Sequence, residues 1–189
     1  MNKVNEIIKK GKELSQNNFT LGGSGNLSIR DNKYLYITKS GIRLGDLKQE
    51  DIIYLPVNEE NFHSKRRGKG ANPSIEGLLH IKTYEKTKAK SIIHSHPIFT
   101  SIISKNLNKL EISKDGYPII GNKRIPIIES LEPGSKKLAT KVSENLTQKN
   151  AVIVRDHGTF VKEESLEKAF KINEKIEELS KKYYLRLFL

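Results

Sequence analysis

Apolar and polar residues alternate with two different periods along this chain, and these periods predict helices and strands in turn. Residues 3–16 carry apolar side chains at helical spacing, with one stripe formed by Val4, Ile7, Ile8 and Leu14. Apolar runs bounded by turn residues predict strands over 27–30, 34–38 and 51–57, and the short first turn favours antiparallel pairing. The polar, glycine-bearing stretch 58–72 predicts a loop or a weak hairpin.

The second half of the chain continues this alternation of helices with strands. A helix is expected to begin at Pro73, with its apolar positions at Ile75, Leu78, Leu79, Ile81 and Tyr84. Strands are predicted over 91–94, within 116–128 and on both sides of 156–158, with helices over 97–105, 135–146 and 165–187. Helices alternating with strand pairs predict an α/β fold, a mixed sheet covered by helices on both faces. No linker or repeat interrupts residues 1–189, so a single domain is expected.

Composition limits the class of protein. With 35% hydrophobic and 30% charged residues, the chain has the balance of a globular protein. It has no run of about 18 apolar residues for a transmembrane helix, and its first helix lacks the apolar core of a signal peptide. It has no cysteine, which excludes disulfides and thiolate metal sites. We therefore expect a cytoplasmic protein with no membrane partner.

The formal net charge of +12 raises the alternative of a nucleic-acid partner. Lysines alternate with glutamates along the predicted helices, however, which is typical of solvated, ion-paired helix faces. Basic residues are concentrated only in His63–Gly70, and no base-reading motif is present. We expect no nucleic-acid partner, and a basic surface would equally attract a small phosphorylated substrate.

Three of the five histidines lie beside predicted strands. His94 and His96 are two residues apart in SIIHSHP. On an extended backbone their side chains therefore point to the same face, with their Cα atoms about 6–7 Å apart. His157 follows the apolar strand AVIV. A histidine after a strand is commonly only a surface or hydrogen-bonding residue. Three imidazoles meeting at one ion would leave a fourth position open, which is the pattern of catalytic zinc.

Glu76 is the strongest acid–base candidate. It lies near the start of a predicted helix, where the helix dipole would stabilise a carboxylate, although it could be an ordinary first-turn glutamate. His80 lies four residues later on the same helix face, so it could orient Glu76, lie near the metal or belong to the core. His63 is expected to be exposed.

Three turns offer groups that bind anions. The glycine-rich run Gly22–Asn26 can form a nest of backbone N–H groups, and residues 38–41 offer a hydroxyl and a second turn. Ser74 adds a hydroxyl near a helix N-terminus. None of these matches a P-loop or a dinucleotide fingerprint, and each alone is commonly just a turn. Beside a catalytic metal, they indicate a small phosphorylated substrate.

The order and spacing of five runs resemble the class II aldolase/adducin family, and most of all its L-fuculose-phosphate aldolase branch. The runs span about residues 17–184 and read GGSGNLSIR, ITKSGI, NPSIEGLLHIKTY, SIIHSHP and AVIVRDHGTFVKEESLEKAF. The resemblance implies a three-layer α-β-α domain with a largely antiparallel central sheet. It also implies a homotetramer whose active sites lie between subunits.

The resemblance further assigns roles to residues. It places a divalent metal, usually zinc, on His94, His96 and His157, with Glu76 as the acid–base residue beside it. The substrate phosphate would be bound at Gly25, Asn26, Ser40, Gly41 and Ser74. The implied reaction is the reversible cleavage of a ketose 1-phosphate, such as L-fuculose 1-phosphate, into dihydroxyacetone phosphate and a small aldehyde such as lactaldehyde.

Several alternatives within the family stay open. A methylthioribulose-1-phosphate dehydratase or a pentulose-phosphate 4-epimerase would use the same site, and a binding module like the adducin head would use none of its chemistry. Two departures from the family pattern stand out. Ile75 occupies the place of a frequent second serine, and Tyr117 is the only tyrosine between the metal motifs that could exchange a proton on the aldehyde side. A tyrosine that these aldolases carry in a C-terminal tail has no clear counterpart.

Overall fold

A computed structural model describes residues 2–67, 72–111 and 124–187 of the chain. In this part of the protein, eight strands form one sheet, and every neighbouring pair is antiparallel except β6 and β7, which are parallel. Across the sheet the strands are β3 (Ile52–Pro56), β2 (Tyr34–Thr38), β1 (Asn26–Asp31), β4 (Ser91–Ser95), β8 (Gly158–Glu163), β7 (Ala151–Val154), β6 (Arg124–Ile128) and β5 (Lys109–Glu111). The predicted mixed, largely antiparallel sheet is confirmed.

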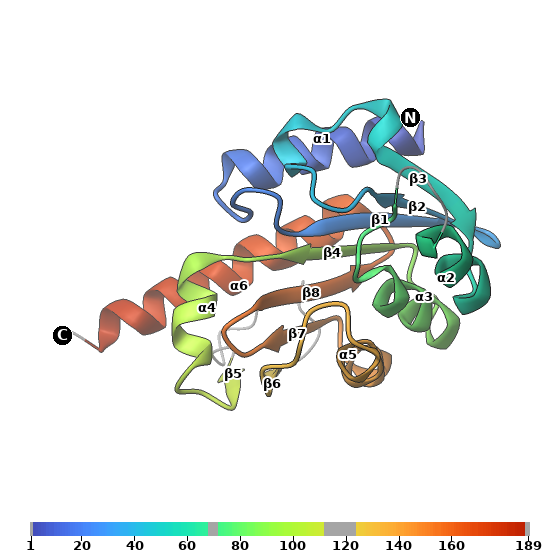
Figure 1. Cartoon of the computed structure of the whole chain (residues 1–189). Helices are drawn as coiled ribbons and strands as arrows, with labels where there is room; N and C mark the ends of the chain where they lie inside the picture. Colours follow the sequence, from blue (N-terminus) through green and yellow to red (C-terminus); the bar gives the residue numbers. More distant parts are fainter. Residues whose placement is uncertain (1, 68–71, 112–123, 188–189) are drawn as a thin grey trace.

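Helices cover both faces of this sheet (Figure 1). One face carries α1 (Lys3–Gln16) and α6 (Leu166–Arg186), and α4 (Ile98–Ser104) packs against α6. The other face carries α2 (Glu59–Arg67), α3 (Gly77–Lys86) and α5 (Lys136–Gln148), while the short 3-10 turns η1 (Leu44–Asp46) and η2 (Gln49–Asp51) precede β3. Each layer buries its own apolar cluster against the sheet, so the predicted three-layer α/β architecture is confirmed. Among the described helices, none combines the length and apolar character needed to cross a membrane.

Local sequence signals fix several helix ends. The Ser135 hydroxyl accepts a hydrogen bond from the backbone N–H of Leu138, at 3.1 Å, and starts α5. Ser165 caps α6 in the same way, accepting from the backbone N–H of Lys168 at 3.2 Å. The helix predicted over residues 165–187 is therefore confirmed as α6. Of the extended segments predicted within 116–128, β6 lies over 124–128, and residues 116–123 are outside the described part of the chain.

The loop or hairpin predicted for residues 58–72 is wrong, because α2 occupies much of it. Phe62 is 2% exposed and packs against the start of α3, where a Cβ on Gly77 would lie 2.4 Å from the Phe62 ring. Glu59 forms an ion pair with Lys82 of α3. One buried aromatic residue and a tertiary ion pair thus hold a helix whose own sequence is strongly polar.

The predicted helix start at Pro73 is also wrong, because α3 begins at Gly77 with Glu76 as its N-cap residue. Residues 72–74 are instead extended and pair with the turn that follows β2. The backbone N–H of Ser40 donates to the Asn72 carbonyl, and that of Ser74 donates to the Thr38 carbonyl, both at 3.0 Å. Ile75 therefore does not join the buried stripe of α3, and its side chain is 41% exposed.

Candidate active site

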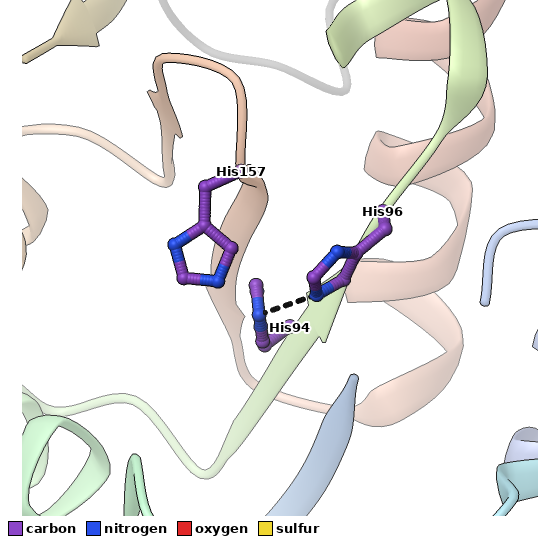
Figure 2. Close-up of side chains that lie close together, drawn as sticks. All are labelled: His94, His96 and His157. Carbon is purple, nitrogen blue, oxygen red and sulfur yellow. Dashed lines mark hydrogen bonds between the residues drawn. The ribbon is translucent and has the colours of Figure 1, made fainter. Parts of the chain in front are cut away.

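Three histidines from two separate stretches of chain meet at one point (Figure 2). His94 and His96 lie at the end of β4, and His157 lies in the turn between β7 and β8. One ligand nitrogen from each ring lies within 4.8 Å of the others, and the Nε2 atoms of His94 and His96 are 2.9 Å apart. These rings could hold one metal ion, as the spacing in the sequence predicts.

A glycine permits this close approach of the two strands. A Cβ on Gly158 would lie 2.2 Å from the backbone carbonyl oxygen of Ser95, far inside any contact distance. Gly158 directly follows His157, and Ser95 lies between His94 and His96. The glycine therefore lets the third imidazole come alongside the first two.

The protonation of the three rings suits a metal. Burial lowers the pKa of His94 well below its usual value, lowers that of His96 to about 4, and lowers that of His157. The Nδ1–H of His94 donates to the backbone carbonyl of Thr159 at 2.9 Å, which leaves the Nε2 lone pair directed at the other imidazoles. Phe160 stacks on the His94 ring at 4.0 Å between centroids and fixes its plane. Neutral imidazoles with their lone pairs converging are the donor set that a divalent metal requires.

A buried hydrogen-bond cluster connects α6 to the two strands that lie beside the three histidines. The Oδ1 of Asn173, on α6, accepts hydrogen bonds from Thr159 Oγ1 at 2.6 Å and from Ser95 Oγ at 3.0 Å. Ser95 and Thr159 are opposite one another in the β4–β8 register. Asn173 therefore ties together the strands that carry the ligands. Sequence reasoning missed this residue, because an asparagine within a helix gives no sign of which strands it will contact.

Glu76 lies directly against the three imidazoles. Its Oε2 is 3.1 Å from His94 Nε2, and its Oε1 is 3.4 Å from His157 Nε2. The side-chain amide of Asn26 donates to Oε2 at 2.9 Å, whereas Oε1 is buried and has no hydrogen-bond partner among the described residues. An unpaired, buried carboxylate oxygen facing neutral imidazoles is a second sign that the site is shaped for a cation.

Burial controls the charge of Glu76. It raises the pKa of this carboxyl to about 7, and the hydrogen bond from Asn26 opposes the rise. The net shift is upward, so the loss of solvent outweighs the stabilisation that the sequence position predicts for this carboxylate. A carboxyl with a pKa near 7 is populated in both forms at neutral pH, which suits an acid–base residue.

The other two histidines lie away from this chemistry. His80 is fully buried, and its Nδ1 forms a 2.6 Å hydrogen bond with Ser28 Oγ, which also contacts Tyr84 OH at 2.7 Å. Its Nε2 has no hydrogen-bond partner in the part of the chain that the structure describes, so of the three predicted places, His80 occupies the core. Burial lowers the pKa of His80 to about 3. His63 is exposed on α2, as predicted.

The histidines and Glu76 form one wall of a cavity of about 370 Å³. All five predicted phosphate-binding residues also line it, and the described lining is Gly23, Ser24, Gly25, Asn26, Lys39, Ser40, Gly41, Ser74, Ile75, Glu76, His94, His96, Pro133 and His157. The structure thus brings residues from all five runs of the sequence resemblance together. Lys39 and Ile75 lie within predicted motifs but had been given no binding role, and Pro133 lies outside the predicted motifs. Tyr117 is outside the described residues, so its assignment stays a prediction.

Glycines bring the turns of this cavity into contact. Gly25 has a positive φ of 80°, and a Cβ there would lie 2.9 Å from the backbone carbonyl oxygen of His94. A Cβ on Gly23 would lie 3.0 Å from the carbonyl oxygen of Gly41. The predicted anion-binding loop is therefore held against both the end of β4, which carries His94, and the Ser40–Gly41 turn.

Known proteins resemble this chain over nearly its full length. An L-fuculose phosphate aldolase of Methanococcus maripaludis is 28% identical over 183 residues, which cover 96% of each chain. A 3-oxo-tetronate 4-phosphate decarboxylase of Haemophilus influenzae is 29% identical, over 94% of this chain and 85% of that protein. The crystal structure of L-fuculose-1-phosphate aldolase from Thermus thermophilus superposes with a TM-score of 0.85 at 25% identity, covering 98% of this chain and 94% of that one.

The family model described as "Class II Aldolase and Adducin N-terminal domain" matches residues 5–184. This range contains every element described above except the first residues of α1 and the last residues of α6. The chain belongs to the class II aldolase and adducin family.

Proposed function

We propose that this protein is a metal-dependent aldolase that reversibly cleaves a ketose 1-phosphate, such as L-fuculose 1-phosphate, into dihydroxyacetone phosphate and a small aldehyde such as lactaldehyde. One observation carries the proposal: a single cavity combines three neutral histidines, a buried carboxyl and glycine- and serine-rich loops. The likeness to a fuculose phosphate aldolase over 96% of both chains supports it.

His94, His96 and His157 would hold the metal, for which zinc is our first choice because imidazole is among its preferred ligands. When bound, the ion supplies a Lewis acid that stabilises negative charge on the substrate oxygens during cleavage. The remaining chemistry falls to the residues around it.

Glu76 would move the proton at the substrate carbon. When the bond between C3 and C4 breaks, C3 of the dihydroxyacetone phosphate half must gain a proton, and in the reverse direction it must lose one. Oε1 is the atom we assign to this transfer, because Asn26 already donates to Oε2, and no group within residues 2–67, 72–111 or 124–187 donates to Oε1. Tyr117 would exchange the hydroxyl proton on the aldehyde side.

The turns at the other end of the cavity would bind the phosphate. Gly25, Asn26, Ser40, Gly41 and Ser74 present backbone N–H groups, an amide and hydroxyls toward one space. Binding energy gained at this non-reacting end orients the sugar relative to the histidines and Glu76. A small phosphorylated sugar is the substrate class that this arrangement fits.

We also propose that the protein assembles as a homotetramer, as the resemblance implied. Exposed apolar side chains on α4 and on the last turns of α6 support self-association, and they are Ile98, Ile102, Tyr183, Leu185 and Leu187. Light scattering coupled to size-exclusion chromatography tests this state.

One experiment separates the candidate reactions. Zinc-loaded protein is incubated in turn with L-fuculose 1-phosphate, 5-methylthioribulose 1-phosphate, ribulose 5-phosphate and 3-oxo-tetronate 4-phosphate, and the products are separated by chromatography that resolves epimers and then identified by mass. An aldolase releases dihydroxyacetone phosphate, and a dehydratase yields a product that is lighter by one water molecule. An epimerase yields an isomer of equal mass, and a decarboxylase releases carbon dioxide. A binding module yields no product. Absence of dihydroxyacetone phosphate from the fuculose reaction would remove the aldolase proposal.

A nucleic-acid role, raised by the net charge of +12, needs a separate test. A mobility-shift series over increasing salt measures it, because binding through phosphates weakens steeply as counterions are added. We expect no shift at physiological salt.

A further inference from the structure

We propose that Lys39 is the cationic residue that binds the substrate phosphate, and that Asp51 holds its ammonium group until the phosphate arrives. This inference rests on the proposed function, since it concerns the phosphate end of the same cavity. Lys39 would thereby determine specificity for phosphorylated over unphosphorylated substrates.

The cavity needs a positive charge that its other groups do not supply. Among the described residues that line it, Lys39 is the only lysine or arginine. The remaining polar groups are serines, Asn26 and histidines whose pKa values are lowered, and Glu76 is acidic. A phosphate monoester carries a charge of about −1.5 to −2 at pH 7, so neutral donors alone would bind it weakly beside a carboxyl group.

The backbone of Lys39 is fixed at the correct place. Its N–H donates to the carbonyl of Asp51 at 2.8 Å, and the residue forms an antiparallel bridge with Pro73. The next residue, Ser40, is tied to Asn72 by a 3.0 Å backbone hydrogen bond. Lys39 thus stands on a rigid turn between two phosphate-binding segments, the one at Ser40 and the one at Ser74.

The side chain of Lys39, by contrast, is only loosely held. Its Nζ is 3.8 Å from Asp51 Oδ1, a long ion pair, and the side chain is 34% exposed. Asp51 has a second partner, because its Oδ2 accepts a hydrogen bond from the backbone N–H of Lys48 at 3.0 Å. Ion pairs of this exposure change an equilibrium by a factor of about five or less. A phosphate offers more charge and closer acceptors, so Lys39 can exchange Asp51 for the ligand while Asp51 keeps its hydrogen bond to Lys48.

Ile75 explains why this cavity depends on a lysine. Its side chain lines the cavity and packs against the 133–134 turn, where a Cβ on Gly134 would lie 3.2 Å from the Ile75 Cβ. This position offers no hydroxyl, so Ser74 is the only hydroxyl donor that the 72–76 segment supplies. Phosphate recognition here therefore rests on charge from Lys39 in place of an additional neutral donor.

The test measures binding of two competitors that differ only in the phosphate. Dissociation constants for 2-phosphoglycolate and for glycolate are determined by calorimetry on the zinc-loaded protein and on Lys39→Met, Lys39→Arg and Asp51→Asn. We expect Lys39→Met to raise the dissociation constant of 2-phosphoglycolate about 10- to 100-fold, the range for loss of a hydrogen bond to a charged group. The dissociation constant of glycolate should not change. Lys39→Arg should retain binding within a few fold, and Asp51→Asn should bind as tightly as the wild type or more tightly.

The outcomes distinguish this inference from the proposed function. If Lys39→Met binds 2-phosphoglycolate as tightly as the wild type, the assignment of Lys39 is overturned and the aldolase proposal stands. If the wild type itself binds 2-phosphoglycolate no more tightly than glycolate, the cavity does not recognise phosphate and the proposed function fails with it. Lys39→Gln, judged by its melting temperature, serves as the second neutral variant if Lys39→Met does not fold.

Discussion

Replacing Glu76 by glutamine separates the proton-transfer chemistry from metal binding. The glutamine side chain has the same size, and its amide oxygen can still accept the hydrogen bond that Asn26 donates at 2.9 Å. The variant loses the group whose pKa burial raises to about 7. His94, His96 and His157 are untouched, so the zinc content should persist.

The expected loss follows from the role of Glu76. General acid–base catalysis contributes typically about 10²- to 10⁴-fold, so kcat for cleavage should fall by this factor, or by about 2.7–5.4 kcal/mol in the barrier. KM should change little, because the phosphate loops remain intact. In D₂O, the wild type should also exchange one C3 hydrogen of dihydroxyacetone phosphate for deuterium, and Glu76→Gln should lose this exchange by a similar factor.

The assay combines zinc analysis, steady-state kinetics and deuterium exchange on the same preparations. Glu174→Gln is the matched control, because burial also raises the pKa of Glu174 but this residue lies on α6 and does not line the cavity. Near-normal exchange and cleavage in zinc-loaded Glu76→Gln would remove Glu76 from proton transfer. A loss of zinc equal to the loss of rate would instead show that Glu76 is needed to hold the metal.

Two further predictions concern stability. The metal-free protein should become more stable as the pH rises from about 4 to 6.5. Burial lowers the pKa of His96 to about 4 and that of His80 to about 3. Between about pH 4 and 6.5 the unfolded chain therefore binds protons that the folded chain does not, and raising the pH removes this advantage of the unfolded state. The raised pKa of Glu76 has the opposite effect on stability, but Glu76 is one group against four histidines whose pKa values are lowered. Urea unfolding midpoints at successive pH values measure the net effect. A midpoint that falls as the pH rises over this range would contradict the buried, neutral histidines. Gly158→Ala should destabilise the protein by about 1–3 kcal/mol and weaken zinc binding, because its Cβ would lie 2.2 Å from the Ser95 carbonyl oxygen; unchanged urea and zinc titrations would show that the strands separate without cost.

The pair His94 and His96 was visible in the sequence because its geometry is local. Side chains two residues apart on a strand point to the same face of the sheet, and β4 leads directly into this pair of histidines. His157 follows another apolar strand, and a glycine after it permits the close approach to Ser95. Strand period was therefore sufficient to predict the pair, whereas the place of His157 beside it was a hypothesis that the family resemblance supported.

Other features depend on contacts that no local pattern contains. The helix α2 forms because Phe62 is buried against Gly77, and Pro73 is extended because its neighbours pair with the turn after β2. The raised pKa of Glu76 results from burial, which a position near a helix start does not reveal. A lysine in a turn is commonly an exposed surface residue, so the sequence offers no reason to assign Lys39 a role. The structure places it in the lining of the cavity. The single-domain extent and the role of Tyr117 stay predictions.

A zinc titration of the metal-free protein tests whether metal binding and catalysis belong to the same three histidines. Release of dihydroxyacetone phosphate from L-fuculose 1-phosphate is measured after each addition, for the wild type and for His94→Ala. We predict that the wild-type rate rises linearly to one zinc per chain and then stays constant, and that His94→Ala stays inactive at that ratio. Cleavage by the chelator-treated wild type, or full activity in His94→Ala, would contradict the site proposed above.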